Sequence, residues 1–144
     1  MFRLIYASLS DPALDGSEVY SLLAKSKSNN QNSGVTGVLI YGQGYFLQVL
    51  EGNRDQVNSV FQRIFIDQRH HDVRIIAAED LDARDFDTWS MEIIGWPDEL
   101  DSSMKQILKE TTGHDELKPF ELDGTQVISL LKKLVRQEGL LGRL

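Results

Sequence analysis

The stretch that most constrains the fold is Val35 to Gly52, VTGVLIYGQGYFLQVLEG. Two runs of branched and aromatic residues flank Gly42-Gln43-Gly44, and glycines permit the positive φ angles of a tight turn. The segment therefore predicts a β-hairpin. Because side chains alternate along a strand, Phe46, Gln48 and Leu50 are expected to share one face of its second strand.

Gln48 thus falls in an apolar row in the middle of a strand. A buried amide group without a partner costs about 1–3 kcal/mol, so this side chain needs a polar contact. Two interpretations follow: a core glutamine bonded to the backbone, or a glutamine that contacts a polar ligand over the sheet. The same choice applies to Tyr6 in the apolar stretch Phe2 to Leu9, which predicts an interior strand.

The remaining pattern of the first 97 residues alternates between helical and extended periods. Helices are predicted over Ser17 to about Ser28 and over Asn53 to Ile66, with Asn29-Asn30 at the exit of the first. Further strands are predicted over Arg74 to Ala78 and Trp89 to Ile94. The two helices are similar in length and are expected to pack on one face of the sheet.

The last part of the chain carries two amphipathic helical patterns, over residues 100–108 and 127–135, the second ending near Gly139. Helices of this length are marginal alone in water. They are expected to cover the bare face of the sheet or to contact another subunit. The chain therefore divides into residues 1–97 and a helical extension, 98–144.

Composition excludes several classes of site. The chain has 144 residues, a formal net charge of −7 and no cysteine, so it offers no thiolate metal site and no basic footprint for nucleic acid or an anionic membrane. Adjacent His70 and His71 point to opposite sides of an extended chain, and no metal site is predicted. No apolar run approaches the roughly 20 residues of a membrane span. The start, MFRLIYAS, lacks a secretory pattern, which predicts a cytoplasmic protein.

Several of these stretches occur together, in the same order, in one known family. RLIYAS, KSNNQNSGVTGVLIY, FLQVLEG, DQRHH and WSM resemble the signatures of the BLUF family, the blue-light sensors that use FAD. The resemblance covers about residues 1–96. The total length is similar to that of the short, stand-alone members with a two-helix C-terminal cap.

The resemblance implies a fold, a cofactor and a set of site residues. The fold is a ferredoxin-like α/β (α+β) sandwich, with a five-stranded mixed sheet, two helices on one face and a C-terminal helical cap. FAD is expected between the two helices, bound non-covalently. Photoactive roles are implied for Tyr6, Gln48, Trp89 and Met91. Contacts to FAD are implied for Asn29, Asn30, Gln48, Arg63, Asp67, Arg69 and His70.

The function implied is light sensing rather than catalysis. Light-driven electron and proton transfer between the tyrosine and the flavin, with rearrangement of the glutamine hydrogen bonds, would signal to an effector protein acting in trans. A homo-oligomer is also expected. Two other classes remain open: an enzyme on the same sandwich, such as an acylphosphatase-like hydrolase or a flavin oxidoreductase, and a module that binds a small metabolite between its helices.

Overall fold

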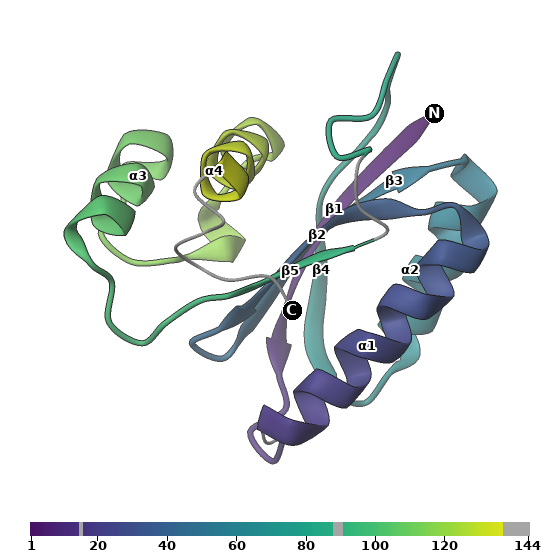
Figure 1. Cartoon of the computed structure of the whole chain (residues 1–144), viewed down its shortest axis with the longest axis horizontal. Coiled ribbons are helices and arrows are strands. Elements are labelled where there is room, and N and C mark those ends of the chain that lie inside the picture. Colours follow the sequence, from purple (N-terminus) through teal and green to yellow (C-terminus); the bar gives the residue numbers. More distant parts are fainter. Residues whose placement is uncertain (15, 88–90, 137–144) are drawn as a thin grey trace.

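The protein is described by a computed structural model that covers residues 1–14, 16–87 and 91–136. Strands and helices alternate through the first part of the chain, and helices fill the last part (Figure 1). The elements are β1 (Phe2–Ser10), α1 (Gly16–Ser33), β2 (Thr36–Gly42), β3 (Tyr45–Gly52), α2 (Arg54–Ile66), β4 (His70–Asp80), β5 (Glu92–Gly95), α3 (Ser102–Thr112), the short 3₁₀ helix η1 (Pro119–Glu121) and α4 (Gly124–Arg136).

The strands form one five-stranded sheet in the order β4-β1-β3-β2-β5. All neighbouring pairs are antiparallel except β2 and β5, which are parallel. The predicted mixed sheet is therefore confirmed, and so is the hairpin. Its two connecting residues, Gln43 and Gly44, have φ angles of 52° and 84°, as the favoured two-residue hairpin turn requires.

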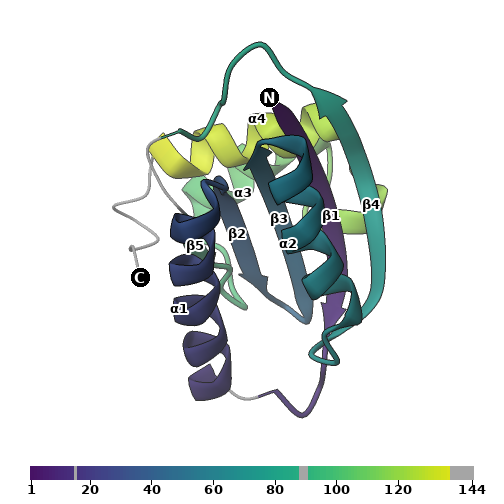
Figure 2. The ribbon, with the colours of Figure 1, turned by 90° about the vertical axis from the view of Figure 1, so that its right-hand side faces the viewer.

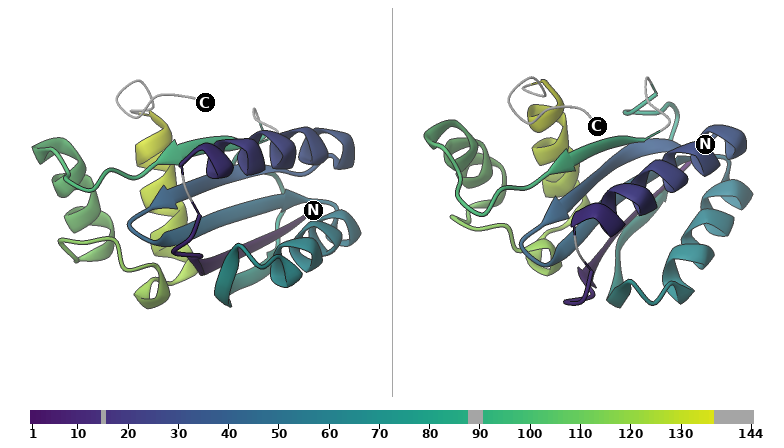
Figure 3. Two further views of the ribbon diagram at one scale, coloured as in Figure 1. Left: turned by 90° about the horizontal axis from the view of Figure 1, so that it is seen from below. Right: turned by 60° about the horizontal axis from the view of Figure 1, so that its bottom comes forward.

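Helices cover both faces of the sheet. α1 and α2 lie on one face, and α4 crosses the other with α3 beside it (Figures 2 and 3). The predicted alternation along β3 separates two cores: Phe46 and Leu50 pack toward α1 and α2, whereas Leu47 and Val49 pack in the core that contains the buried face of α4. The fold is the α+β sandwich that the sequence predicted.

Three element boundaries differ from the prediction. α1 continues to Ser33, so Asn29 and Asn30 lie within its last turns and not beyond its exit. The helix continues because its stop signal comes later: Gly34 adopts a φ of 71°, and the Val35 N–H donates to the Asn30 carbonyl at 3.2 Å, the pattern of a Schellman C-cap.

β4 begins at His70 instead of Arg74, because pairing with β1 extends through the charged turn. β5 spans only Glu92–Gly95, and Met91 precedes it. Trp89 and the predicted helix end at Gly139 lie outside the described residues.

The cap helices bury their apolar faces inside the chain. Val127, Leu130 and Leu131 of α4 are fully buried in the same core as Ile5 and Ile40 of the sheet. In the described ranges, large exposed apolar side chains occur elsewhere, namely at Met1, Phe65, Ile66 and Ile75. On α3 and α4 as far as the structure describes them, no large apolar side chain is exposed for the contact with another subunit that was expected there, and the homo-oligomer stays a prediction. The division at residues 97 and 98 stays a prediction.

Within those same ranges, no helix combines the length and apolar character needed to cross a membrane.

Candidate functional site

A cavity of about 200 Å³ opens between α1, α2 and the sheet. Many of its wall residues are those that the sequence singled out. These are Tyr6, Asn29, Asn30, Gln48, Arg63, Asp67, Arg69 and His70. They come from two helices, two interior strands, the turn before β4 and the first residue of β4. Their roles in binding stay predictions, but the fold gathers them around one space.

Tyr6 and Gln48 form the polar centre of this cavity. They stand opposite each other on the antiparallel strands β1 and β3, and the Tyr6 hydroxyl donates to Gln48 Oε1 at 2.5 Å. Gln48 Nε2 in turn donates to the thioether sulfur of Met91 at 3.4 Å. All three side chains are buried. One end of the amide thus meets a phenol and the other meets a weak acceptor.

Burial also sets the protonation of the phenol. Loss of solvent, with a smaller contribution from the charge of Asp67, raises the pKa of Tyr6 well above its ordinary value. Desolvation disfavours the phenolate, so Tyr6 keeps its proton at neutral pH and acts as a hydrogen-bond donor. A proton leaving this hydroxyl has Gln48 Oε1 as its immediate acceptor.

Asn30 places a buried hydrogen-bond donor at the cavity. The residue is 2% exposed, and its Nδ2 has no hydrogen-bond partner among the described residues. A buried amide donor is normally satisfied, and leaving it unpaired costs about 1–3 kcal/mol. The side chain lines the cavity beside Asn29. A ligand with an acceptor at this end of the cavity would satisfy it.

His70 closes the cavity as an uncharged ring. Its Nδ1 lies 2.8 Å from the Ser8 hydroxyl, and its ring centre lies 4.3 Å from that of Phe46. Burial lowers the pKa of His70 to about 4. The ring therefore offers hydrogen bonds to a ligand but no positive charge at neutral pH.

The predicted arginines differ in their contacts. The Arg69 guanidinium binds both carboxylate oxygens of Asp67, at 2.8 and 2.5 Å, and these bonds lower the pKa of that carboxyl. The charge of Arg69 is thus already paired. Arg63 is exposed, and within the described part of the chain its guanidinium makes one long contact, 3.5 Å, to the Ser59 carbonyl. Of these two, Arg63 is the better placed to meet an anionic part of a ligand.

Sequence reasoning missed cavity residues on α1, including Lys25 and Ser26. The signal was present. Leu22 and Leu23 fall at helical spacing with Ser26, and three and four residues after Ser26 the same face reaches Asn29 and Asn30. Ending the helix near Ser28 hid the continuity of this face.

The lining as a whole suits a flat ring with a polar edge. Its apolar walls are contributed by both helices and the sheet: Leu22, Leu23, Leu39, Phe46, Val60 and Ile64. The amides of Asn30 and Gln48 supply the few oriented polar groups that a ligand site of this kind needs. A flavin has this combination of surfaces, so the residues present fit it.

Comparison with known proteins gives the same assignment. Residues 1–92 match the family model BLUF, described as sensors of blue-light using FAD. Photoactivated adenylate cyclase subunit alpha of Euglena gracilis is 28% identical over 108 residues, which are 75% of this chain and 10% of that protein. The blue light- and temperature-regulated antirepressor BluF of Escherichia coli (strain K12) is 29% identical over 76 residues, 53% of this chain and 19% of that protein. This chain therefore spans about a tenth to a fifth of the length of these curated relatives.

Solved structures of similar size align over nearly the whole chain. The photo-activated state of BlsA has a TM-score of 0.81 and 25% sequence identity, covering 93% of this chain and 94% of that one. The dark-state structure of BlrB, a BLUF protein, has a TM-score of 0.73 and 25% identity, covering 95% and 96%. With a family match over residues 1–92 and this shared fold, the chain belongs to the BLUF family of blue-light sensors that use FAD.

Proposed function

We propose that residues 1–97 sense blue light through FAD bound in the cavity between α1 and α2, and that residues 98–144 pass the signal to a separate effector protein. The observation that carries the proposal is the buried chain of contacts that starts at the cavity-lining pair Tyr6 and Gln48 and continues to Met91. A sensor, rather than a catalyst, is what this arrangement serves.

The side chains that would hold the cofactor follow from their chemistry. Asn30 and Gln48 would bind the polar edge of the ring, with Asn29 and His70 beside them. Arg63 would meet the ribityl or phosphate portion, and the paired Asp67 and Arg69 would border it. Bound FAD supplies a strong oxidant when it absorbs blue light.

Tyr6 is the electron donor in this proposal. A phenol gives up an electron more readily when its proton leaves at the same time, and the bond to Gln48 Oε1 provides that exit inside a site where charge is costly. Return of the electron and the proton to Tyr6 restores both side chains, so the cycle has no net chemistry.

Gln48 converts this transfer into a structural signal. Its amide has donors at one end and an acceptor at the other, so rotation or tautomerisation exchanges what it offers to Tyr6, to the ligand and to Met91. In the arrangement described here, Nε2 faces the Met91 sulfur. After exchange that donor would be lost. Trp89, which the family resemblance pairs with Met91, remains part of the proposal.

The experiment that tests this function is an absorption spectrum of the purified protein before and after blue light. We expect a yellow protein whose flavin spectrum shifts slightly to the red and returns in the dark. A flavin that is reduced and turns over a substrate would support an oxidoreductase instead. A colourless protein that gains no colour when FAD is added would contradict the proposal and favour a metabolite-binding module or a hydrolase.

Asn30→Ala is expected to weaken FAD binding without destabilising the FAD-free protein. The ligand loses a partner worth about 1–3 kcal/mol, or about 5- to 150-fold in Kd. In the FAD-free protein the Nδ2 donor that is removed has no partner among the described residues. Fluorescence titration with FAD measures the first effect and thermal unfolding of the FAD-free protein measures the second.

Asn58→Ala is the matched control, because it removes the same side-chain amide from an exposed position on α2. It should bind FAD as the wild type does. Equal affinities for Asn30→Ala and Asn58→Ala would remove Asn30 from the binding site.

A further inference from the structure

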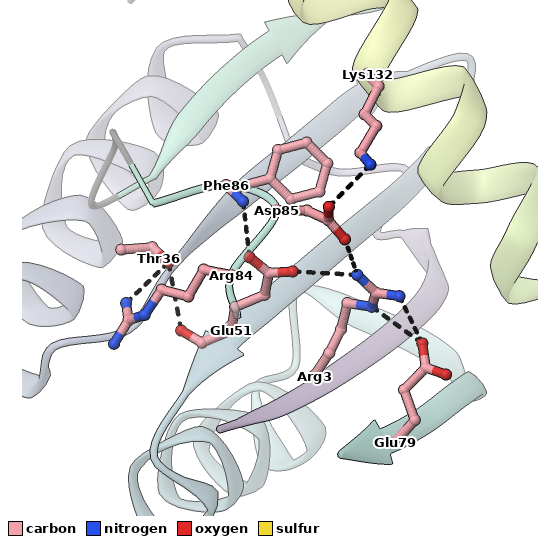
Figure 4. Close-up of polar contacts among 8 residues, drawn as sticks. All are labelled: Arg3, Thr36, Glu51, Glu79, Arg84, Asp85, Phe86 and Lys132. Atoms are coloured by element: carbon pink, nitrogen blue, oxygen red, sulfur yellow. Dashed lines mark hydrogen bonds and ion pairs between the residues drawn. The ribbon is translucent and has the colours of Figure 1, made fainter. Parts of the chain in front are cut away.

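A second buried polar group on β3 lies outside the cavity. Glu51 is 0% exposed and points toward the cap side of the sheet (Figure 4). Its Oε1 accepts from the Phe86 backbone N–H at 2.8 Å, and its Oε2 accepts from Arg3 Nη1 at 3.3 Å. A fully buried carboxylate is costly without partners, and both of its oxygens are satisfied here.

The same arginine extends the network to the cap. Arg3 Nη1 also donates to Asp85 Oδ2 at 2.5 Å, and Arg3 Nη2 donates to Glu79 at 2.6 Å. Asp85 Oδ1 lies 2.8 Å from Lys132 Nζ on α4. Burial acts to raise the pKa of Asp85, but its bonds to Lys132 and Arg3 outweigh that effect and lower it. Asp85 is thus a charged bridge between the sheet and α4 (Figure 4).

Strand β3 contacts the chain at two described positions that follow β4, Phe86 and Met91. Gln48 donates to the Met91 sulfur on the cavity side, and Glu51 accepts from the Phe86 N–H on the cap side. The Phe86 ring is buried in the core that α4 shares. A change at Gln48 would remove the contact to Met91, whereas Phe86, next to Asp85, would keep its bond to Glu51.

We propose that Glu51, Arg3, Asp85 and Lys132 form a latch through which the state of Gln48 controls how tightly α4 is held on the sheet. The inference rests on the proposed function, since it concerns the output of the same site. It names Asp85–Lys132 as the contact that opens.

The solvent exposure of each ion pair in the latch indicates which pair can separate at low cost. The side chains of Glu51 and Arg3 are 0% and 11% exposed, so separating them would leave a buried charge unpaired. The side chains of Lys132 and Asp85 are 44% and 30% exposed. Water can solvate both when they part, and such pairs are weak. Lys132 can therefore alternate between two states with small differences in free energy, which coupling of this kind requires.

Hydrogen exchange across residues 124–136, in the dark and under blue light, tests the latch. In wild type we expect faster exchange under light. In Lys132→Gln the pair is already lost, so dark exchange should resemble the lit wild type and the light-induced difference should fall to less than half. The red shift should be unchanged, because Lys132 belongs to α4, which lies on the face of the sheet opposite α1 and α2 (Figures 2 and 3).

Two further variants control for altered charge on α4. Lys133→Gln removes a neighbouring charge whose partner, Glu110, lies on α3 within the cap, and it should keep the wild-type difference. Lys132→Arg keeps a positive charge opposite Asp85 and should therefore also keep the light-induced difference in exchange.

The outcomes separate this inference from the function on which it rests. Absence of a red shift in wild type would overturn both. A normal red shift with no light-induced change in α4, or with the same change in Lys132→Gln as in wild type, would overturn the latch alone.

Discussion

Tyr6→Phe should leave the protein yellow but unable to form the red-shifted state. The substitution removes one oxygen and keeps the ring that packs beside Phe61 and His70, so folding and FAD binding should survive. It removes the hydroxyl that donates to Gln48 Oε1 at 2.5 Å, and with it the proposed donor of the electron and the proton. Light-minus-dark difference spectra measure the loss, and flavin fluorescence should rise because quenching by the phenol disappears.

Tyr45→Phe is the matched control. Tyr45 lies on the same strand, three residues before Gln48, but its ring packs against Phe120 of the cap side at 5.7 Å. The light-induced red shift of Tyr45→Phe should equal that of the wild type. A normal, reversible red shift in Tyr6→Phe would exclude the role assigned to that hydroxyl.

Gln48→Leu should produce the same loss for a different reason. The electron donor remains, but the proton acceptor and the exchangeable amide are gone. Trp89 is a possible alternative electron donor, so Trp89→Phe is measured beside it and should keep the red shift. If Gln48→Leu shifts to the red and recovers in the dark, the signal does not pass through this amide.

The centre of the site could be predicted because local sequence patterns place it. Alternation along one hairpin strand put Gln48 in an apolar row, and an interior strand put Tyr6 in another. Periodicity could not give their register, which depends on how β1 pairs with β3. Nor could it give the position of Asn30, because the end of α1 is set by one glycine conformation and not by the pattern before it.

The charged network could not be predicted from sequence at all. In the sequence, Glu51 is one polar residue near the end of the hairpin, and Arg3 is one polar residue in the first predicted strand. Their contacts join residues far apart in the chain, from Arg3 to Asp85 to Lys132. Local patterns carry no information about such pairs. Glutamate side chains are also rarely fully buried, so the residue type alone predicts that Glu51 is exposed.

Arg3→Met should destabilise the protein more than any exposed charge change. It preserves an apolar stem but leaves Glu51 fully buried with only the Phe86 N–H as a partner. Breaking a buried ion pair from one side typically costs about 3–5 kcal/mol in the free energy of unfolding. Urea unfolding followed by circular dichroism measures it, and the change should lie in the midpoint and not in the slope.

Two comparisons show whether the cost comes from the stranded charge. Arg54→Met removes an arginine whose pair with Asp80 is exposed on both sides, and it should cost no more than about 1 kcal/mol. Arg3→Met combined with Glu51→Gln should recover most of the lost stability, because a neutral side chain can still accept from the Phe86 N–H. A cost for Arg3→Met near that of Arg54→Met would mean that water reaches Glu51. In that case β3 would not hold the loop at residues 84–86 through a buried charge, and the fixed end that the latch needs would be missing.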